Sequence, residues 1–196
     1  MDISQVCIFG NVQISTQVIR ELLAREIPVC YYTYGGWFIG YTSGLGHKNI
    51  EMRIQQFQVA SKPEQSIKLA RAFVEGKIRN CRTLLRRNHP DPPLAVMAEL
   101  SRLLRQASKA ETSETLLGIE GAAAKVYFSN LPALLKPRGE EEIAAFNFTT
   151  RNRRPPTDPV NALLSFVYAL LMKDVTVVLQ TTGFDPYLGF YHRPRY

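Results

Sequence analysis

The chain has 196 residues, enough for one large domain or two small ones. Hydrophobic residues make up 45% of it, which excludes wholesale disorder and allows a sizeable core. Lys and Arg number 24 against 17 Asp and Glu, and the resulting net charge of +7 favours nucleic acid or an anionic surface as a partner without proving either.

The cysteines and the apolar runs bear on cellular location. Cys7, Cys30 and Cys81 are odd in number and form no CxxC pair, which is typical of a reducing compartment and argues against a zinc or iron–sulfur site. The start of the chain lacks the basic and apolar regions of a signal peptide. The longest apolar run, 162–172, is shorter than the roughly 20 residues that span a bilayer. We therefore expect a cytoplasmic protein.

The first 45 residues predict a strand, a helix and a hairpin. Their β-rich start is broken at Gly10, Ser15 is placed to cap a helix, and Pro28 ends that helix. The predicted elements are a strand within 3–14, a helix over about 16–26, and strands over 29–33 and 37–42. Two or three strands by themselves are only marginally stable in water. We therefore expect residues 1–45 to be the remainder of an N-terminal β-rich domain whose first strands are missing.

Beyond a loop at 43–48 the pattern becomes helical. Ser61 and Pro63 mark the start of a long helix, and Asp158 the cap of the last one. The predicted helices span 49–60, about 61–87, 94–109, 114–135 and 159–173. Residues 175–179 are β-branched, but with no strand nearby in sequence we predict that the last helix continues through them. The expected fold is α+β, with a linker and first helix at 46–60 and a larger all-α catalytic domain at 61–196.

Glu120 is a candidate site residue because it interrupts an apolar helical stripe. No Lys or Arg stands three or four residues away to pair with it, and burying an unpaired carboxylate is costly. Gly118, Gly121 and the alanines that follow leave room for a large group to approach. A metal ion would satisfy the carboxylate, and so would a distant Arg or solvent at the helix edge.

His192 is the second candidate. It ends the run 183–192, in which two glycines and a proline predict a loop of fixed shape. A neutral imidazole on such a loop can bind a metal, although a lone His is more often only hydrogen-bonded. His47 and His89 lie in polar loops and receive no role, and Asp185, just before a proline, is expected to form a turn.

The basic residues form two groups that suit contacts with phosphate, although a basic helix face can also serve only solubility. The first is a stripe on the long helix, and the second lies in a loop. Lys173 and the arginines near the end of the chain add a looser third group. The candidate contacts are Lys77, Arg79 and Arg82 in the first group, Arg151, Arg153 and Arg154 in the second, and Arg193 in the third.

Several motifs together resemble one family. Residues 118–128 are similar to a glutamate helix, 151–168 to an arginine-rich loop followed by an asparagine helix with Asn161, and 183–192 to a histidine loop. Residues 8–15 and 76–80 also fit. Their order and spacing resemble those of the CRISPR-associated integrase, the subunit that inserts new spacers into a CRISPR array, over nearly the whole chain.

The resemblance implies a metal-dependent DNA integrase or endonuclease. In that family a Glu, a His and a further carboxylate hold Mg²⁺ or Mn²⁺, which implies catalytic and metal-binding roles for Glu120 and His192. The implied reaction is transesterification, in which the 3′-hydroxyl of a captured DNA fragment attacks the repeat boundary. The basic residues and Asn161 would contact DNA. The third carboxylate follows the histidine in the family, so we expect these 196 residues alone to bind metal weakly.

The implied partners are prespacer and repeat DNA, a second copy of the chain, and a small dimer with a ferredoxin-like fold. An iron–sulfur CRISPR nuclease, sometimes fused upstream, is a further implied partner, and the location is a prokaryotic cytoplasm. Two alternatives stay open: a non-catalytic DNA-binding scaffold in which Glu120 and His192 are structural, and a general metal-dependent DNA nuclease. Prespacer length, repeat sequence and the metal used in the cell do not follow from the sequence.

Overall fold

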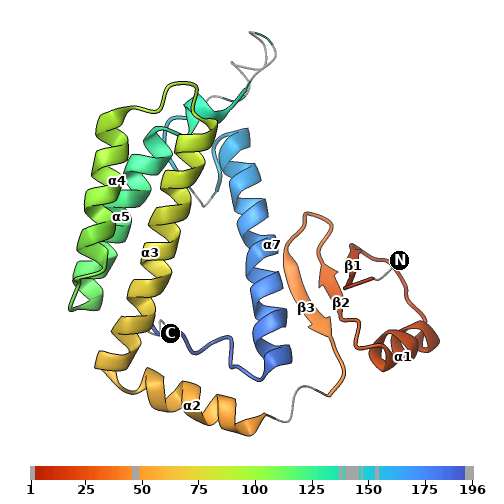
Figure 1. Ribbon diagram of the computed structural model, residues 1–196. Coiled ribbons are helices and arrows are strands. Elements are labelled where there is room, and N and C mark those ends of the chain that lie inside the picture. The colour runs from red at the N-terminus through yellow and green to blue at the C-terminus, as the bar shows by residue number, and fades with distance from the viewer. Residues whose placement is uncertain are drawn as a thin grey trace. The chain divides into compact units, whose positions relative to one another are not determined.

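The computed structural model describes residues 3–45, 49–136, 139, 146, 148–152 and 155–192. Figure 1 shows a small sheet and a series of helices along this chain. The elements are β1 (Val6–Phe9), α1 (Thr16–Ala24), β2 (Val29–Tyr32), β3 (Phe38–Thr42), α2 (Ile50–Ala60), α3 (Pro63–Asn88), α4 (Leu94–Ala107), α5 (Ser113–Ser129), the 3₁₀ helix η1 (Pro132–Leu134) and α7 (Pro159–Thr182). The expected α+β mixture is confirmed, and the division into a β-rich and an all-α domain stays a prediction.

The sheet has the order β1-β2-β3, with β1 parallel to β2 and β2 antiparallel to β3. Helix α1 connects the parallel strands, and Ser15 caps it as predicted, because its hydroxyl accepts a hydrogen bond from the Val18 N–H at 3.4 Å. In the hairpin turn Gly36 has a φ of 83°, and an added Cβ would come within 2.8 Å of Phe166 on α7. Both the left-handed backbone and this close approach require glycine there.

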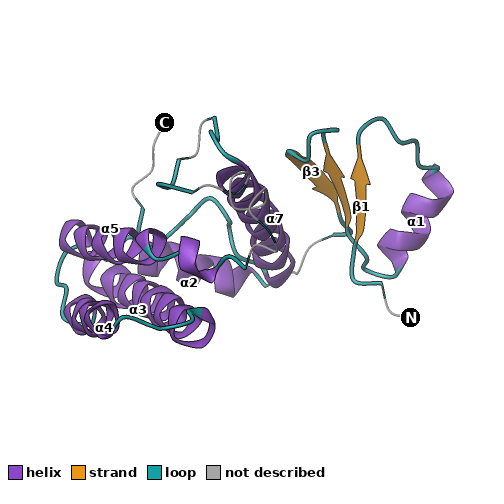
Figure 2. Ribbon diagram, turned by 90° about the horizontal axis from the view of Figure 1, so that it is seen from above, coloured by secondary structure: helices purple, strands orange, loops and turns teal. Residues whose placement is uncertain are grey.

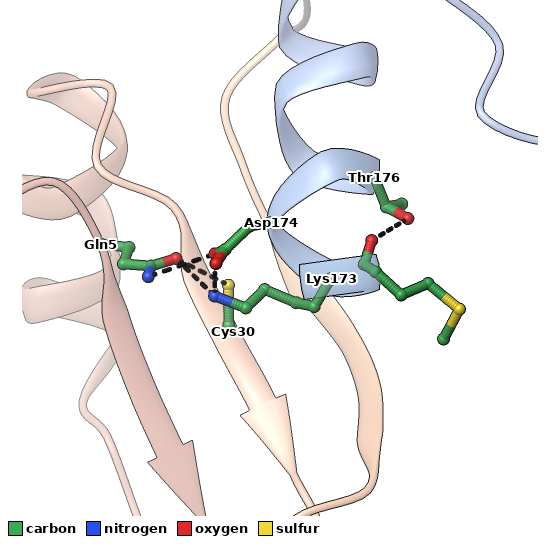
Figure 3. A network of polar contacts seen from close by, with 6 residues as sticks. Gln5, Cys30, Lys173, Asp174 and Thr176 are labelled. Carbon is green, nitrogen blue, oxygen red and sulfur yellow. Dashed lines mark hydrogen bonds and ion pairs between the residues drawn. The ribbon is translucent and has the colours of Figure 1, made fainter. Parts of the chain in front are cut away.

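Helix α7 packs against the sheet. Val177 is buried with Cys30 and Tyr32 of β2, and Leu170 packs against the same cluster. Lys173 reaches the same place: its side chain is only 2% exposed, and its ammonium donates to Gln5 Oε1 at 2.8 Å (Figure 3). Lys173 therefore stabilises this packing, and the expectation that it adds to a DNA-binding group is wrong because it is buried.

The prediction that the last helix continues through residues 175–179 is confirmed, since α7 runs unbroken to Thr182. Contact with the sheet outweighs the strand preference of its β-branched residues. By length and composition α7 could cross a membrane, with a mean hydropathy of 1.9, and it is the single such helix among the described residues. The apolar run at 162–172 underestimated the length of this apolar helix, because α7 continues past Lys173 to Thr182. One such helix is weak evidence for a membrane span, and Gln5, directly before β1, binds its central lysine.

Helices α3, α4 and α5 lie side by side in both views (Figures 1 and 2). Their shared core is apolar and includes Ile78, Leu100 and Leu116, each almost fully buried. The start of α3 differs from the prediction: Lys62, not Ser61, is the N-cap, with no side-chain cap bond. Ser61 instead donates to Gln58 O at the end of α2, since it follows directly on that helix.

The internal contacts divide the chain into two units, and neither is continuous in sequence. Residues 1–56 group with 163–188, and residues 57–162 group with 189–196. Most of α7 thus belongs with the sheet, whereas the sequence assigned all of 61–196 to the helical part. The proposed domain boundaries at residues 45 and 60 stay a prediction.

Candidate active site

Glu120 lies on α5, and its carboxylate is bound by a lysine from another helix. Lys77 on α3 places its Nζ 2.5 Å from Glu120 Oε1, with the carboxylate side chain 17% and the lysine side chain 48% exposed. Helical spacing can indicate partners only three or four positions away on α5, and Lys77 is 43 positions earlier, so this ion pair was not predicted. The surface beside the carboxylate is open, because an added Cβ at Gly118 or Gly121 would meet nothing within 4 Å.

The surroundings keep the Glu120 carboxyl ionised. Burial raises its pKa, but the hydrogen bond and charge of Lys77, the Tyr191 hydroxyl and the charge of His192 lower it, and the net pKa lies below its usual range. Burial and the negative carboxylate in turn raise the pKa of Tyr191, which keeps the phenol protonated. The site therefore offers a negative oxygen ligand whose present counter-ion is an ammonium group.

His192 lies in the same unit as Glu120, and its charge is close enough to lower the Glu120 pKa. The imidazole is exposed and rests on the neighbouring Tyr191, with the ring centroids 4.8 Å apart. The structure thus brings the two predicted ligands into one region. Tyr191, which the sequence did not single out, packs against the core of the helices and also contacts the His192 ring.

A carboxylate oxygen and an imidazole nitrogen fit Mg²⁺ or, better, Mn²⁺ in their donor chemistry. To use Glu120 Oε1, a cation would have to replace the Lys77 ammonium. Across the part of the chain that the structure describes, no group of three or more His, Cys, Asp or Glu side chains could hold a metal. The metal-binding roles of Glu120 and His192 therefore stay predictions.

The loop that leads to His192 has the fixed shape expected of it. The Asp185 carboxylate accepts a hydrogen bond from the Tyr187 N–H at 2.8 Å, which confirms the predicted turn. Gln56 of α2, for which no role was predicted from the sequence, also binds the backbone of this loop. His89 accepts a hydrogen bond from the Asp91 N–H in its own turn, and His47 lies outside the described residues.

Asn161 is the centre of a buried hydrogen-bond network at the start of α7. Its Oδ1 accepts from Arg151 Nη1 at 2.8 Å and from the Asn152 N–H at 3.0 Å. Its Nδ2 donates to Thr150 O at 2.8 Å and to Asp158 Oδ2 at 2.6 Å. The side chain is 0% exposed, so it holds the arginine-rich loop in place and does not face solvent, and the expectation that Asn161 contacts DNA stays a prediction.

The residues predicted to contact phosphate differ in their exposure and in their bonding partners. Arg79 is exposed on α3, Arg82 is half-buried, and Lys77 is the partner of Glu120. Arg151 is half-buried and bound to Asn161. Arg153, Arg154 and Arg193 lie outside the described residues. The DNA-binding roles of this set stay predictions.

Replacing Asn161 with Ala is expected to raise the pKa of Asp158. The side-chain hydrogen bond from Asn161 is the main cause that lowers this pKa, so its loss moves the value back toward the ordinary one. We also expect unfolding to become easier by about 1–3 kcal/mol, because buried polar groups lose their partner. Titration of the carboxyl carbons by NMR measures the first effect. Asn88→Ala, on an exposed residue, is the control, and an unchanged Asp158 pKa in the Asn161 variant would contradict the assignment.

Comparison with known proteins identifies a class of CRISPR-associated proteins. The family model described as CRISPR associated protein Cas1 matches residues 1–196. The chain is 49% identical over 199 residues to a CRISPR-associated exonuclease Cas4/endonuclease Cas1 fusion of Geobacter sulfurreducens, covering 98% of this chain and 35% of that protein. The chain belongs to the Cas1 family, which confirms the resemblance read from its motifs.

Solved structures agree with this assignment. A Cas1 protein from Thermotoga maritima aligns over 97% of this chain and 58% of its own, with a TM-score of 0.74 and 25% identity. A Cas6-RT-Cas1–Cas2 complex aligns over 98% of this chain and 21% of its own, with a TM-score of 0.74 and 28% identity. The chain spans about a third of the Geobacter fusion and a little over half of the Thermotoga protein.

Proposed function

We propose that the protein is a metal-dependent DNA integrase of CRISPR adaptation, joining the 3′-hydroxyl ends of a prespacer to the CRISPR repeat. The observation that carries the proposal is the placement of Glu120 and His192 in one region of a Cas1-family chain, with the carboxylate ionised. The similarity to an endonuclease fusion supports a DNA-cleaving or DNA-joining activity.

In the proposed reaction, the 3′-hydroxyl oxygen attacks a phosphorus atom of the repeat backbone. A new P–O ester bond forms, the original one breaks, and the proton of the attacking hydroxyl ends on the released 3′-oxygen. Glu120 and His192 would hold the Mg²⁺ or Mn²⁺, which when bound supplies positive charge to the reacting phosphate. Lys77 keeps the carboxylate paired until then, and Arg79 and Arg151 would hold the DNA backbone without reading its sequence.

The proposed partners are prespacer and repeat DNA, a second copy of the chain, and a small ferredoxin-like Cas2 dimer. Cas2 is named with Cas1 in the solved complex, and Cas4 with Cas1 in the Geobacter fusion, which supports both as partners of relatives. A Cas4-type iron–sulfur nuclease is therefore a further proposed partner. For a DNA-acting CRISPR protein we propose the cytoplasm as the location.

Replacing His192 with Ala is expected to abolish strand joining by the full-length protein while leaving DNA binding intact. The measurement is a half-site integration assay with Mn²⁺, a labelled prespacer and a repeat-containing plasmid. His89→Ala, on a histidine to which we assign no role, is the control. Unchanged joined product would favour the scaffold alternative, and plasmid cleavage without joining would favour a general nuclease.

A further inference from the structure

Helix α2 buries a single residue, and that residue is polar. Gln56 is 4% exposed, while the apolar Ile54 and Phe57 beside it are about half exposed, at 49% and 51%. Burying an amide in place of an aliphatic side chain costs free energy unless all of its hydrogen bonds are made. The placement therefore calls for partners that only an amide can satisfy.

The partners are backbone groups of the loop after α7. Gln56 Nε2 donates to Asp185 O and to Leu188 O, each at 2.8 Å, and Gln56 Oε1 accepts from the Asp185 N–H at 2.8 Å. Both amide hydrogens and the carbonyl oxygen are used. A glutamate has the same shape but cannot donate to two carbonyl groups, and an apolar side chain of the same length replaces none of the three bonds.

The loop that Gln56 binds leads directly to His192. It leaves α7 at Gly183, whose φ of 100° reverses the chain, and the Asp185 turn then shapes it. Only three residues separate Leu188 from His192, and no helix or strand follows among the described residues to fix them. The three bonds from α2 therefore hold the loop at Asp185 and Leu188, where the segment that carries His192 begins. Tyr191, directly before the histidine, packs against the helical core.

We propose that Gln56 is a positioning residue for the metal site: by binding the backbone at Asp185 and Leu188, it fixes the path of the segment that carries His192. This inference rests on the proposed function, in which His192 is a metal ligand. Groups that orient a ligand without touching the metal commonly change metal affinity about 10- to 100-fold when removed.

The test measures Mn²⁺ binding by the full-length protein, with the concentration of free Mn²⁺ monitored by electron paramagnetic resonance. Gln56→Met, which keeps the length of the side chain, is expected to weaken binding about 10-fold. Gln56→Glu is expected to weaken it at least as much, because a carboxylate then faces two carbonyl oxygens. Gln55→Glu, on the exposed neighbouring position, is the matched control and should change nothing.

A double variant separates positioning from a general structural role. If Gln56 acts through His192, then Gln56→Met combined with His192→Ala binds Mn²⁺ no more weakly than His192→Ala alone. Additive losses, or full Mn²⁺ affinity in Gln56→Met, would overturn the inference. If the Met variant does not fold, Gln56→Asn keeps the amide but shortens its reach and gives the same comparison. Should His192→Ala leave Mn²⁺ binding unchanged, the proposed function fails first, and hydrogen exchange at the Asp185 amide then reports on the loop alone.

Discussion

Replacing Glu120 with Gln is expected to reduce strand joining by at least ~100-fold and to leave DNA binding within about twofold. Glutamine keeps the size of the side chain but lacks the negative charge that a hard cation needs. Loss of groups that merely support a metal ligand costs 10- to 100-fold, and loss of a ligand itself should cost no less. The measurements are the half-site integration assay with Mn²⁺ and a parallel DNA-binding titration.

Two controls make the Glu120 result specific. Glu51→Gln removes an exposed carboxylate from α2 and should leave strand joining unchanged. Stability against pH is the second. Because folding lowers the Glu120 pKa, its ion pair with Lys77 stabilises the protein above the ordinary glutamate pKa of about 4.3. That contribution is lost as the pH falls through the folded pKa, so wild type and variant should become more alike in acid. Strand joining that survives the replacement would refute the metal role of Glu120.

Replacing Asp174 with Ala is expected to destabilise the protein more than replacing Lys173 with Met. The Lys173 ammonium is buried and bonds both Asp174 Oδ1 and Gln5 Oε1 (Figure 3). Removing the carboxylate leaves the buried ammonium with one partner fewer, and because Asp174 is 52% exposed and solvent screens part of the pair, the expected cost is about 1–3 kcal/mol. Replacing the lysine by an apolar side chain of similar length removes the charge itself and can be nearly neutral. Urea unfolding of the two variants at neutral pH measures the difference.

The alkaline behaviour of Lys173 gives an independent check on this asymmetry. Burial lowers the pKa of the ammonium, but the bonds to Asp174 and to the Tyr32 hydroxyl raise it, and the net pKa is raised. The stabilisation is therefore complete below the ordinary lysine pKa of about 10.4 and is lost as the pH rises through the folded pKa. Lys173→Met should not show this loss. A Met variant less stable than the Asp174 variant would contradict the role assigned to the pair, and Asp91→Asn on an exposed loop residue is the control.

Local signals in the sequence predicted the elements but not the contacts between distant ones. Helical periodicity and the Ser15 cap gave α1 correctly, and α7 was followed through its β-branched end. Hydrogen-bonding partners far apart in the chain leave no periodic pattern, so the pairing of Glu120 with Lys77 and the hold of Gln56 on Asp185 were not visible. For the same reason Lys173 was counted among solvent-exposed cations, although the sheet buries it.

The roles of the predicted site residues stay predictions, and the structure adds only where these residues lie. Local patterns made Glu120 and His192 candidates, the family resemblance implied their metal-binding roles, and the structure brings them into one region. Asn161 was also singled out, but its buried hydrogen-bond network was not predicted, because a motif identifies a residue without revealing whether its side chain faces solvent or other side chains. The only feature of the sequence that could have indicated a role for Tyr191 is its position next to His192.

The return of residues 163–188 to the sheet has a consequence for synthesis on the ribosome. Gln5 and Lys173 are 168 positions apart, so at ordinary translation rates the lysine emerges roughly 10–30 s after its partner. Until then Cys30 and Tyr32 on the central strand have no α7 to cover them. Helices α3, α4 and α5 follow one another directly and can pack within that interval. During synthesis, helices α3, α4 and α5 are therefore expected to pack together before α7 covers the sheet. Strands β1, β2 and β3 stay exposed to incorrect pairing until α7 has been made.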